Sequence, residues 1–171
     1  MNAGTLLLAC ALDAAIGDPR WLPHPVRLMG RAIVWYERGI RRVVVGRTGE
    51  RVAGVVLALG LPALCYGLAW LTIDLSGRVH KTVGMGVEVF LAFTTLAARD
   101  LADHALVVGR ALERDSLEDA RRSVARIVGR DTAQLSEAEV TRATVEAVAE
   151  STSDGVVAPL FYLLLGGAPL A

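Results

Sequence analysis

The feature that most constrains this chain is a run of 22 residues, from Val52 to Ile73, without a charged side chain. At about 1.5 Å of rise per residue, a helix of that length crosses the roughly 30 Å hydrocarbon core of a bilayer. The run therefore predicts a transmembrane helix. Pro62 removes a backbone donor inside it, and we expect a kink there.

Three further apolar runs point to the same class of protein. Residues 3–17 are apolar except for Asp13, a carboxylate that should face protein or water. A helical pattern over 83–114 is apolar in its first half and amphipathic in its second, and the chain is apolar again from Val156. With 53% apolar residues and a mean hydropathy of +0.45, the chain is predicted to be an all-α, polytopic helical membrane protein with amphipathic cytoplasmic helices. We expect residues 1–171 to form one helical membrane domain.

Capping signals predict two more helices in the polar region. Ser116 followed by Asp119 resembles a capping box that opens one helix, and we expect Gly129 to end it. Ser136 with Glu139 is a second capping box and opens the other helix.

Basic residues predict the orientation. Segments 18–51 and 99–154 are read as large loops with eight basic residues each, whereas the polar link 74–82 has two lysine or arginine residues. By the positive-inside rule, both large loops should be cytoplasmic and the link should face outside. The formal net charge is zero, so no global field indicates a nucleic-acid partner.

The first candidate site lies between Gly17 and Gly30, where three prolines make a rigid extended turn. Asp18 would hold Mg²⁺, His24 would move protons and Arg27 would grip an oxyanion. The alternative is a membrane-interface loop in which tryptophans anchor the chain and arginines set its topology.

A second candidate runs from Arg126 to Asp131, and a third lies further along the chain. Arg130 beside Asp131 is either a weak surface salt bridge or a phosphate clamp with a metal-binding acid beside it, and spacing leaves both open. In the third, Glu146 and Glu150 are four residues apart on one helical face.

The like charges of this third candidate need a cation between them. Mg²⁺ with nucleotide or an arginine from elsewhere would serve, and pairing of Glu146 with Arg142 is the simpler account. Asp154 adds a carboxylate just before the last apolar run. The sequence has no Walker-type glycine loop, no HExxH and no supported Ser-His-Asp arrangement, and Cys10 and Cys65 lack metal-ligand spacing.

Four segments of the sequence resemble those of a known protein family, and this resemblance adds information that the spacing of single residues does not supply. They are LDAAIGDPRWLPHPVRLMGR, FTTLAARDL, IVGRDT and ATVEAVAESTSDGVVAPLFYLLLGGAPLA. In this order, across nearly all of the chain, they resemble the N-terminal half of the CobD/CbiB family, the adenosylcobinamide-phosphate synthases of cobalamin biosynthesis.

The resemblance implies a multi-pass enzyme of the bacterial inner membrane. It would join adenosylcobyric acid, a corrinoid, to (R)-1-aminopropan-2-ol or its O-phosphate, consuming ATP with Mg²⁺ and forming an amide. The carboxylate must be activated before amine attack, as an acyl phosphate, and this needs acids for Mg²⁺ and arginines for phosphate. We therefore assign hypothetical roles: catalytic for Glu146, Glu150 and Asp154; substrate-binding for His24, Arg27, Arg99, Arg126 and Arg130; Mg²⁺-binding for Asp18 and Asp131.

Two departures from the family pattern favour another interpretation. The family reads E-N-T-x-D-G where this chain has Ser151 in place of asparagine; serine can still form a hydrogen bond, but it lacks the second polar group of the amide. Family members also continue for about the same length again, so we expect a truncated N-terminal part, completed by a C-terminal partner polypeptide or inactive alone. The alternative function is a non-enzymatic membrane sensor or scaffold of the same architecture.

Overall fold

A computed structural model describes residues 1–19, 25–44 and 46–171. Every regular element within these ranges is helical, which confirms the all-α prediction. The elements are α1 (Ala3–Ile16), α2 (Pro25–Val43), α3 (Arg47–Val79), α4 (Lys81–Phe93), α5 (Ala98–Glu113), α6 (Leu117–Val124), α7 (Glu137–Thr152), the π-helix η1 (Ser153–Val157) and α8 (Ala158–Gly166).

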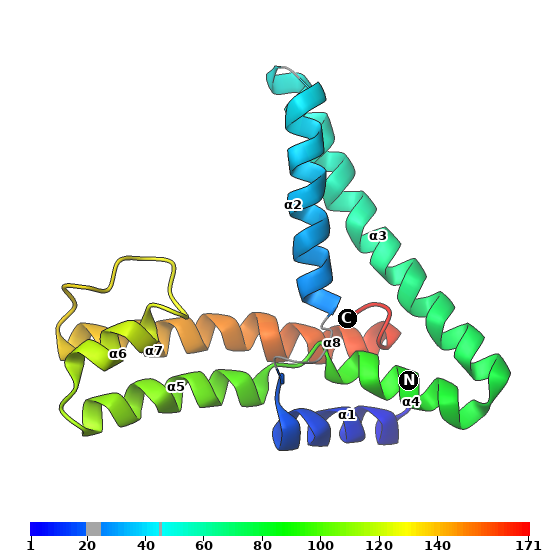
Figure 1. Cartoon of the computed structure of the whole chain (residues 1–171). Helices are drawn as coiled ribbons and strands as arrows, with labels where there is room; N and C mark the ends of the chain where they lie inside the picture. The colour runs from blue at the N-terminus through cyan, green and yellow to red at the C-terminus, as the bar shows by residue number, and fades with distance from the viewer. Residues whose placement is uncertain (20–24, 45) are drawn as a thin grey trace.

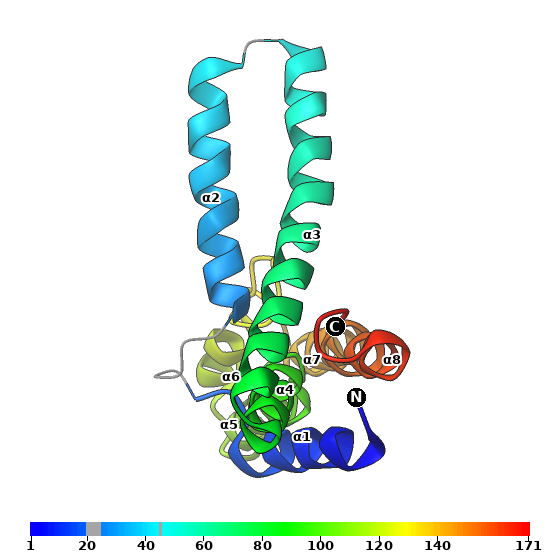
Figure 2. The same cartoon turned by 90° about the vertical axis from the view of Figure 1, so that its right-hand side faces the viewer.

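Two long, interrupted rods organise the molecule (Figure 1). One is α4 followed nearly in line by α5, and the other is α7 followed through η1 by α8. The short helix α1 packs against α4 and α5, while α6 packs against α5 and α7. The antiparallel pair α2 and α3 stands away from both rods, and α3 returns to pack on α4 (Figure 2).

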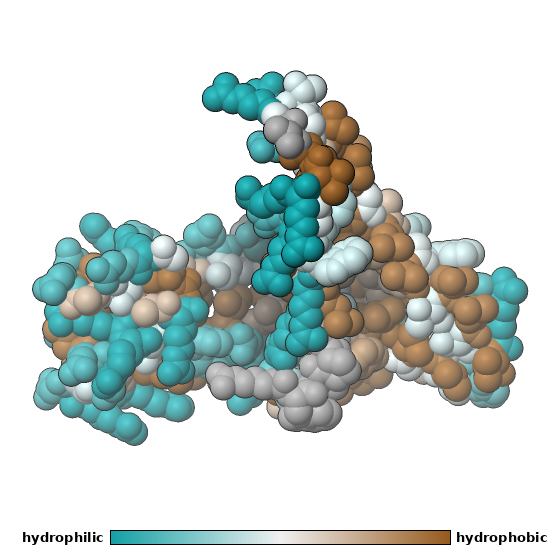
Figure 3. Space-filling model, turned by 45° about the horizontal axis from the view of Figure 1, so that its top comes forward, coloured by the Kyte–Doolittle hydropathy of each residue, from teal (hydrophilic) through white to brown (hydrophobic). Residues whose placement is uncertain are grey.

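Each end of the rods has its own core. The polar end is a small bundle of α5, α6 and α7, and the other end joins α1, α4 and α8. The first core contains Val108, Ala120, Val124, Val140 and Ala143; the second contains Ala9, Ala92, Phe93, Leu96, Leu163 and Ala168. Figure 3 shows the same division on the surface, with hydrophilic side chains gathered over one end of the rods and hydrophobic ones over the other.

The transmembrane prediction is confirmed and extended. Three helical stretches in the described part of the chain, 47–79, 81–113 and 137–166, each contain a segment that is long and apolar enough to cross a membrane. Helix α3 has 33 residues, with only Ala53 buried. It is therefore about 50 Å long, longer than the bilayer core, and such a helix fits by tilting. Figure 1 shows α3 running obliquely to the rods.

Gly84 allows α3 and α4 to turn back on each other closely. A Cβ atom at this buried position would lie 2.7 Å from the Cα of Gly77 and 2.9 Å from its nitrogen. Because these are backbone atoms, the clash cannot be relieved by a rotamer change. We expect Gly84→Ala to destabilise the fold by about 1–3 kcal/mol, as overpacking typically does. Thermal unfolding in detergent measures the effect.

Gly86→Ala is the matched control, because it lies on the same helix and its Cβ would meet nothing within 4 Å. Because alanine favours a helix more than glycine does, Gly86→Ala should not lose stability, and an equal loss in both variants would show that the Gly77 contact does not set the stability of the turn between α3 and α4.

Two segments read as loops or links are helical. The proposed loop 18–51 contains α2, and the link 74–82 is helical except for a corner at His80. Helix α2 was not predicted, because its arginines were interpreted only as signals of membrane topology. Their spacing also leaves one helix side apolar, which is the pattern of an amphipathic helix.

Two predicted helix boundaries are also wrong. The pattern over 83–114 is broken between Phe93 and Ala98, and α6 ends at Val124 instead of continuing to Gly129. The segment after α6 is tied back to it: the Thr132 hydroxyl donates to the Arg121 carbonyl at 3.0 Å, and Nε of Arg121 donates to a carbonyl farther along at 2.7 Å. These tertiary hydrogen bonds end the helix earlier than its cap signal predicts.

Candidate functional site

The two rods are interrupted at the same level, and a hydrogen bond ties the interruptions together. In the gap between α4 and α5, the Ala97 N–H donates to the Gly155 carbonyl in η1 at 3.0 Å. A π-turn shifts the helical hydrogen-bond register, and such turns are frequent at functional sites. A Cβ on Gly155 would lie 3.3 Å from that of Ala97, so the glycine permits this close approach.

Asp13 joins α1 to the same junction. It is 3% exposed, and its Oδ2 accepts the N–H groups of Ala98 at 3.0 Å and Arg99 at 3.4 Å. These are the first, otherwise unpaired donors of α5, so a carboxylate from a distant helix caps it. Arg99 in turn donates to the Ala14 carbonyl at 3.0 Å and pairs with Asp103 at 3.0 Å. Asp13 was predicted to face protein or water, and the structure shows that it faces protein; its role as a helix cap was not foreseen.

A polar hollow of about 570 Å³ lies against this junction. It brings together residues from the turn after α1, from α2 and from the end of α7. Asp18 accepts from Nη2 of Arg27 at 3.2 Å. The charged residues that line the hollow are Asp18, Arg27, Asp100, Glu150 and Asp154.

A second hollow of about 420 Å³ adjoins the first. The two share Val26, Thr94, Thr95 and Asp154. Most other lining residues of the second hollow are apolar and come from α3, α8 and the segment after α8. A carboxylate-rich pocket therefore opens beside an apolar one, an arrangement suited to a ligand with a charged end and an apolar body.

Glu146 and Glu150 form an acidic row on α7 that leads into the polar hollow, which Glu150 lines. Glu146 lies one turn before Glu150 and pairs with Arg130 at 3.4 Å and with Arg142 at 3.9 Å. Of the three sources of positive charge considered from the sequence, both arginine sources, the i,i+4 arginine and one from elsewhere, are thus present. Asp131, by contrast, accepts the backbone N–H of Ala133 at 3.0 Å in its own turn.

The remaining candidate residues lie elsewhere. Arg126 lines a separate hollow of about 210 Å³ that also contains Asp103 and His104. Arg99 is held at the junction with α1. His24 lies outside the described residues. Asp100 borders both this hollow and the polar one; it stands inside the FTTLAARDL segment but was not singled out.

Two carboxylates of the polar hollow could contribute to a site for Mg²⁺ bound together with a phosphate-bearing substrate. Within the described ranges, no three His, Cys, Asp or Glu side chains are arranged as a ready metal-binding group. Mg²⁺ usually keeps several waters and uses one or two carboxylates plus substrate phosphates. Asp18 and Asp154, which both line the hollow, supply such carboxylates, and Arg27 supplies a cation for phosphate.

The capping box at the start of α7 fixes the helix that carries the acidic row. The Ser136 N–H donates to Glu139 at 2.7 Å and its hydroxyl accepts from the Glu139 N–H at 3.4 Å, which confirms the prediction. The backbone and hydroxyl donors of Ser136 lower the pKa of Glu139 below its ordinary value of 4.5.

Because the pKa of Glu139 is lower in the folded state than in the unfolded state, its ionised carboxylate stabilises the fold when the pH is above the unfolded-state pKa. This stabilisation is lost as the pH falls through the folded-state pKa. We therefore expect the first turn of α7 to lose hydrogen-exchange protection as pH falls below about 4.5, after correction for intrinsic exchange rates. Glu139→Gln should remove this acid dependence, whereas Glu137→Gln, an exposed neighbour, should keep it. The same acid dependence in all three proteins would contradict the assignment.

Comparison with known proteins gives consistent relatives. A family model described as CobD/Cbib protein matches residues 6–171. The chain is 47% identical over 164 residues to the cobalamin biosynthesis protein CbiB of Salmonella typhimurium, covering 96% of this chain and 51% of that protein. It is 47% identical over 170 residues to the cobalamin biosynthesis protein CobD of Klebsiella pneumoniae, covering 98% and 53%.

A third relative is the cobalamin biosynthesis protein CobD of Geobacter metallireducens, 49% identical over 171 residues, covering 99% of this chain and 53% of the relative. The chain thus spans about half the length of the curated relatives it matches. No solved structure matches it.

Proposed function

Because the chain belongs to the CobD/CbiB protein family, we propose that it forms the N-terminal part of an amide-forming enzyme of cobalamin biosynthesis. The enzyme joins adenosylcobyric acid to (R)-1-aminopropan-2-ol or its O-phosphate at the expense of ATP. The observation that carries the proposal is the polar hollow, where Asp18, Arg27, Glu150 and Asp154 meet beside an apolar hollow. The corrinoid carboxylate and the ATP phosphates meet in the polar hollow.

The reaction proceeds in two balanced steps. A carboxylate oxygen of the corrinoid attacks the γ-phosphorus of ATP, forming an acyl phosphate as ADP leaves. The amine nitrogen then attacks the acyl carbon, and inorganic phosphate leaves with the former carboxylate oxygen. Glu150 accepts the proton released by the amine nitrogen. Arg27 binds the transferred phosphate, and Asp18 and Asp154 would hold Mg²⁺, which would neutralise phosphate charge when bound.

A non-enzymatic sensor or scaffold is the second candidate. The observation that favours it is the position of Ser151, which replaces the family's asparagine and lines the polar hollow itself. This departure therefore falls on the site and not on a remote surface.

Complementation distinguishes the two candidates. Residues 1–171 are joined to the C-terminal half of the Salmonella relative, giving what we call the joined enzyme. It is expressed in a bacterium that lacks its own family member and needs cobinamide. Growth on cobyric acid with aminopropanol supports the enzyme. A joined enzyme that inserts into the membrane but never supports growth, even as Ser151→Asn, supports the scaffold.

We further propose that the chain lies in the bacterial inner membrane with α5–α7 in the cytoplasm, as the basic residues of that segment predict. Alkaline phosphatase fused after His80 is expected to be active, because that corner faces the periplasm. The same enzyme fused after Gly129 is expected to be inactive. The reverse pattern would invert the orientation.

A further inference from the structure

Helix α2 has two chemically distinct sides. Its five arginines fall on one side of the helix when the sequence is projected at 100° per residue. The opposite side is apolar. The arginines are Arg27, Arg31, Arg38, Arg41 and Arg42, and the apolar side carries Val26, Leu28, Met29, Ala32, Ile33, Trp35, Tyr36 and Ile40.

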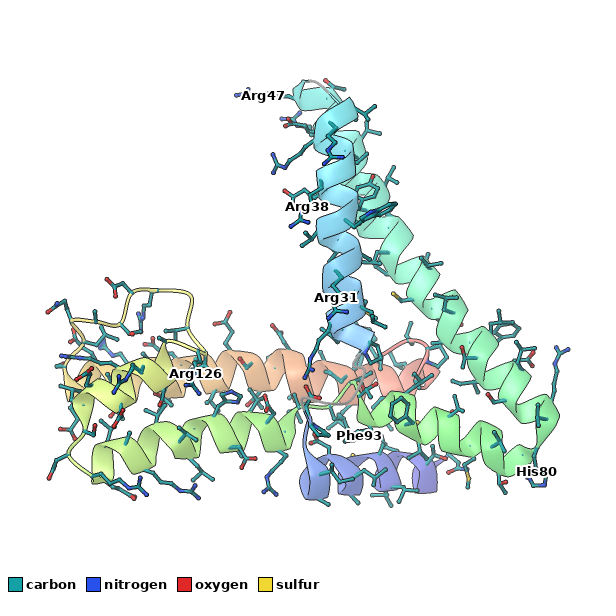
Figure 4. All side chains as sticks on the ribbon, in the orientation of Figure 1. Arg31, Arg38, Arg47, His80, Phe93 and Arg126 are labelled. Atoms are coloured by element: carbon teal, nitrogen blue, oxygen red, sulfur yellow. The ribbon has the colours of Figure 1, made fainter. Side chains whose placement is uncertain are left out.

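The arginine side offers free cations. Arg31, Arg38 and Arg42 are exposed, and none has an acidic partner among the residues that the structure describes, whereas Arg41 pairs with Glu37 at 2.6 Å. Arg31 and Arg38 lie beside Trp35 along an open surface formed by α2 alone. Figure 4 shows Arg38 extending from the side of α2 turned away from α3.

The apolar side is only partly covered. Tyr36 donates its hydroxyl to the Ala53 carbonyl of α3 at 3.0 Å, but no residue of α2 is buried. Trp35 is 80% exposed and Leu28 is 57% exposed. In the helical projection Trp35 lies at the border between the arginine and apolar sides, the position that interfacial tryptophans occupy at a membrane surface.

The fold places α2 at the boundary between the polar and apolar parts of the molecule. Its first turn contributes Val26 to both hollows, beside Thr94 and Asp154 at the paired breaks of the rods. From there α2 runs across the direction of the rods (Figures 1 and 2). The polar α5–α7 bundle lies on one side of that level and the apolar α4 and α8 lie on the other.

We propose that α2 lies flat on the membrane surface and that its exposed Arg31, Arg38 and Arg42 bind the phosphate groups of anionic phospholipids. Guanidinium groups form paired hydrogen bonds to phosphate, and a helix with one basic side and one apolar side binds in the interface plane. The net charge of α2 favours anionic phospholipids as the binding partner, because five arginines and one glutamate make the helix strongly positive. The inference is independent of the proposed ligase activity.

The test uses the chain in nanodiscs with Trp35 as its single tryptophan, through Trp21→Phe and Trp70→Phe. Trp35 is expected to be shielded from acrylamide, and quenched by lipids brominated near the headgroup, in discs that contain phosphatidylglycerol. In purely phosphatidylcholine discs it should become accessible. Arg31→Gln with Arg38→Gln should shift the shielded–exposed equilibrium about 25-fold toward exposure, about fivefold for each arginine near an anionic surface.

Arg110→Gln with Arg114→Gln is the matched control, since it removes the same charge from exposed positions at the end of α5 and should leave Trp35 unchanged. Equal acrylamide access in both kinds of disc would overturn the proposal. Shielding in every lipid and in detergent would instead assign the surface to a second copy or another polypeptide. Shielding restored in neutral discs by inorganic phosphate would assign it to a free anion.

Discussion

Asp154→Asn is expected to lower amide formation by the joined enzyme by about 10²–10³-fold, the loss typical when one preorganised charge is removed from a reacting centre. Asp154 is exposed to both the polar and the apolar hollow, so it lies where phosphate and corrinoid would meet. Asparagine keeps the shape and removes only the negative charge, so π-helix η1 should stay intact. Product formed in membrane vesicles, with protein amount matched by immunoblot, measures the change.

Glu113→Gln is the control for this substitution, because Glu113 is an exposed carboxylate at the far end of α5. It should retain full activity. If a folded Asp154→Asn enzyme forms amide as fast as the unchanged protein, the polar hollow has no part in the reaction and the chemistry lies elsewhere, including in the half of the relatives that this chain does not cover.

Asp13→Ala is expected to cost about 1–3 kcal/mol of stability, the usual penalty for leaving a buried donor without its partner. The substitution leaves the Ala98 and Arg99 N–H groups without their acceptor. It also weakens the connection between α1 and the start of α5, which then depends on the hydrogen bond from Arg99 to the Ala14 carbonyl. Thermal unfolding in nanodiscs measures the loss, and faster proteolysis between Phe93 and Ala98 would locate it at the junction.

Two further substitutions separate the cap from general charge effects. Asp13→Asn keeps one oxygen acceptor and should lose less stability than Asp13→Ala. Asp103→Ala removes an exposed partner of Arg99 and should change stability by less than about 1 kcal/mol, as surface ion pairs do. Equal stability of Asp13→Ala and the unchanged chain would mean that α5 starts without help from α1.

The sequence predicts most of what depends on local pattern. The uncharged run 52–73 lies inside α3, and the Ser136–Glu139 capping box opens α7. Both signals arise from neighbouring residues and need no tertiary information. Helix α2 could have been predicted in the same way, because its amphipathic pattern is also local. It was missed because the prolines before it and its many arginines favoured a loop.

The junction could not be predicted in the same way, because its contacts join residues far apart in sequence. Asp13 caps a helix 85 residues away, and Ala97 bonds to Gly155 in η1. The break between α4 and α5 has no proline to mark it, and although Pro159 stands just after η1, a proline alone does not indicate which distant residue will pair with the break. Of the predicted site residues, Asp18, Arg27, Glu150 and Asp154 share a hollow, while Arg126 and Asp131 lie apart from it. Their catalytic roles remain predictions.

The most direct test of the proposed function follows one oxygen atom. Adenosylcobyric acid labelled with ¹⁸O in its reacting carboxylate is given to vesicles that contain the joined enzyme, with aminopropanol phosphate and MgATP. Acyl-phosphate formation predicts one ¹⁸O in inorganic phosphate for each amide formed, and Asp154→Asn should lose both products together. Label recovered in AMP would contradict the acyl-phosphate route. Properly inserted protein that forms neither amide nor labelled phosphate would contradict the assignment as an amide-forming enzyme.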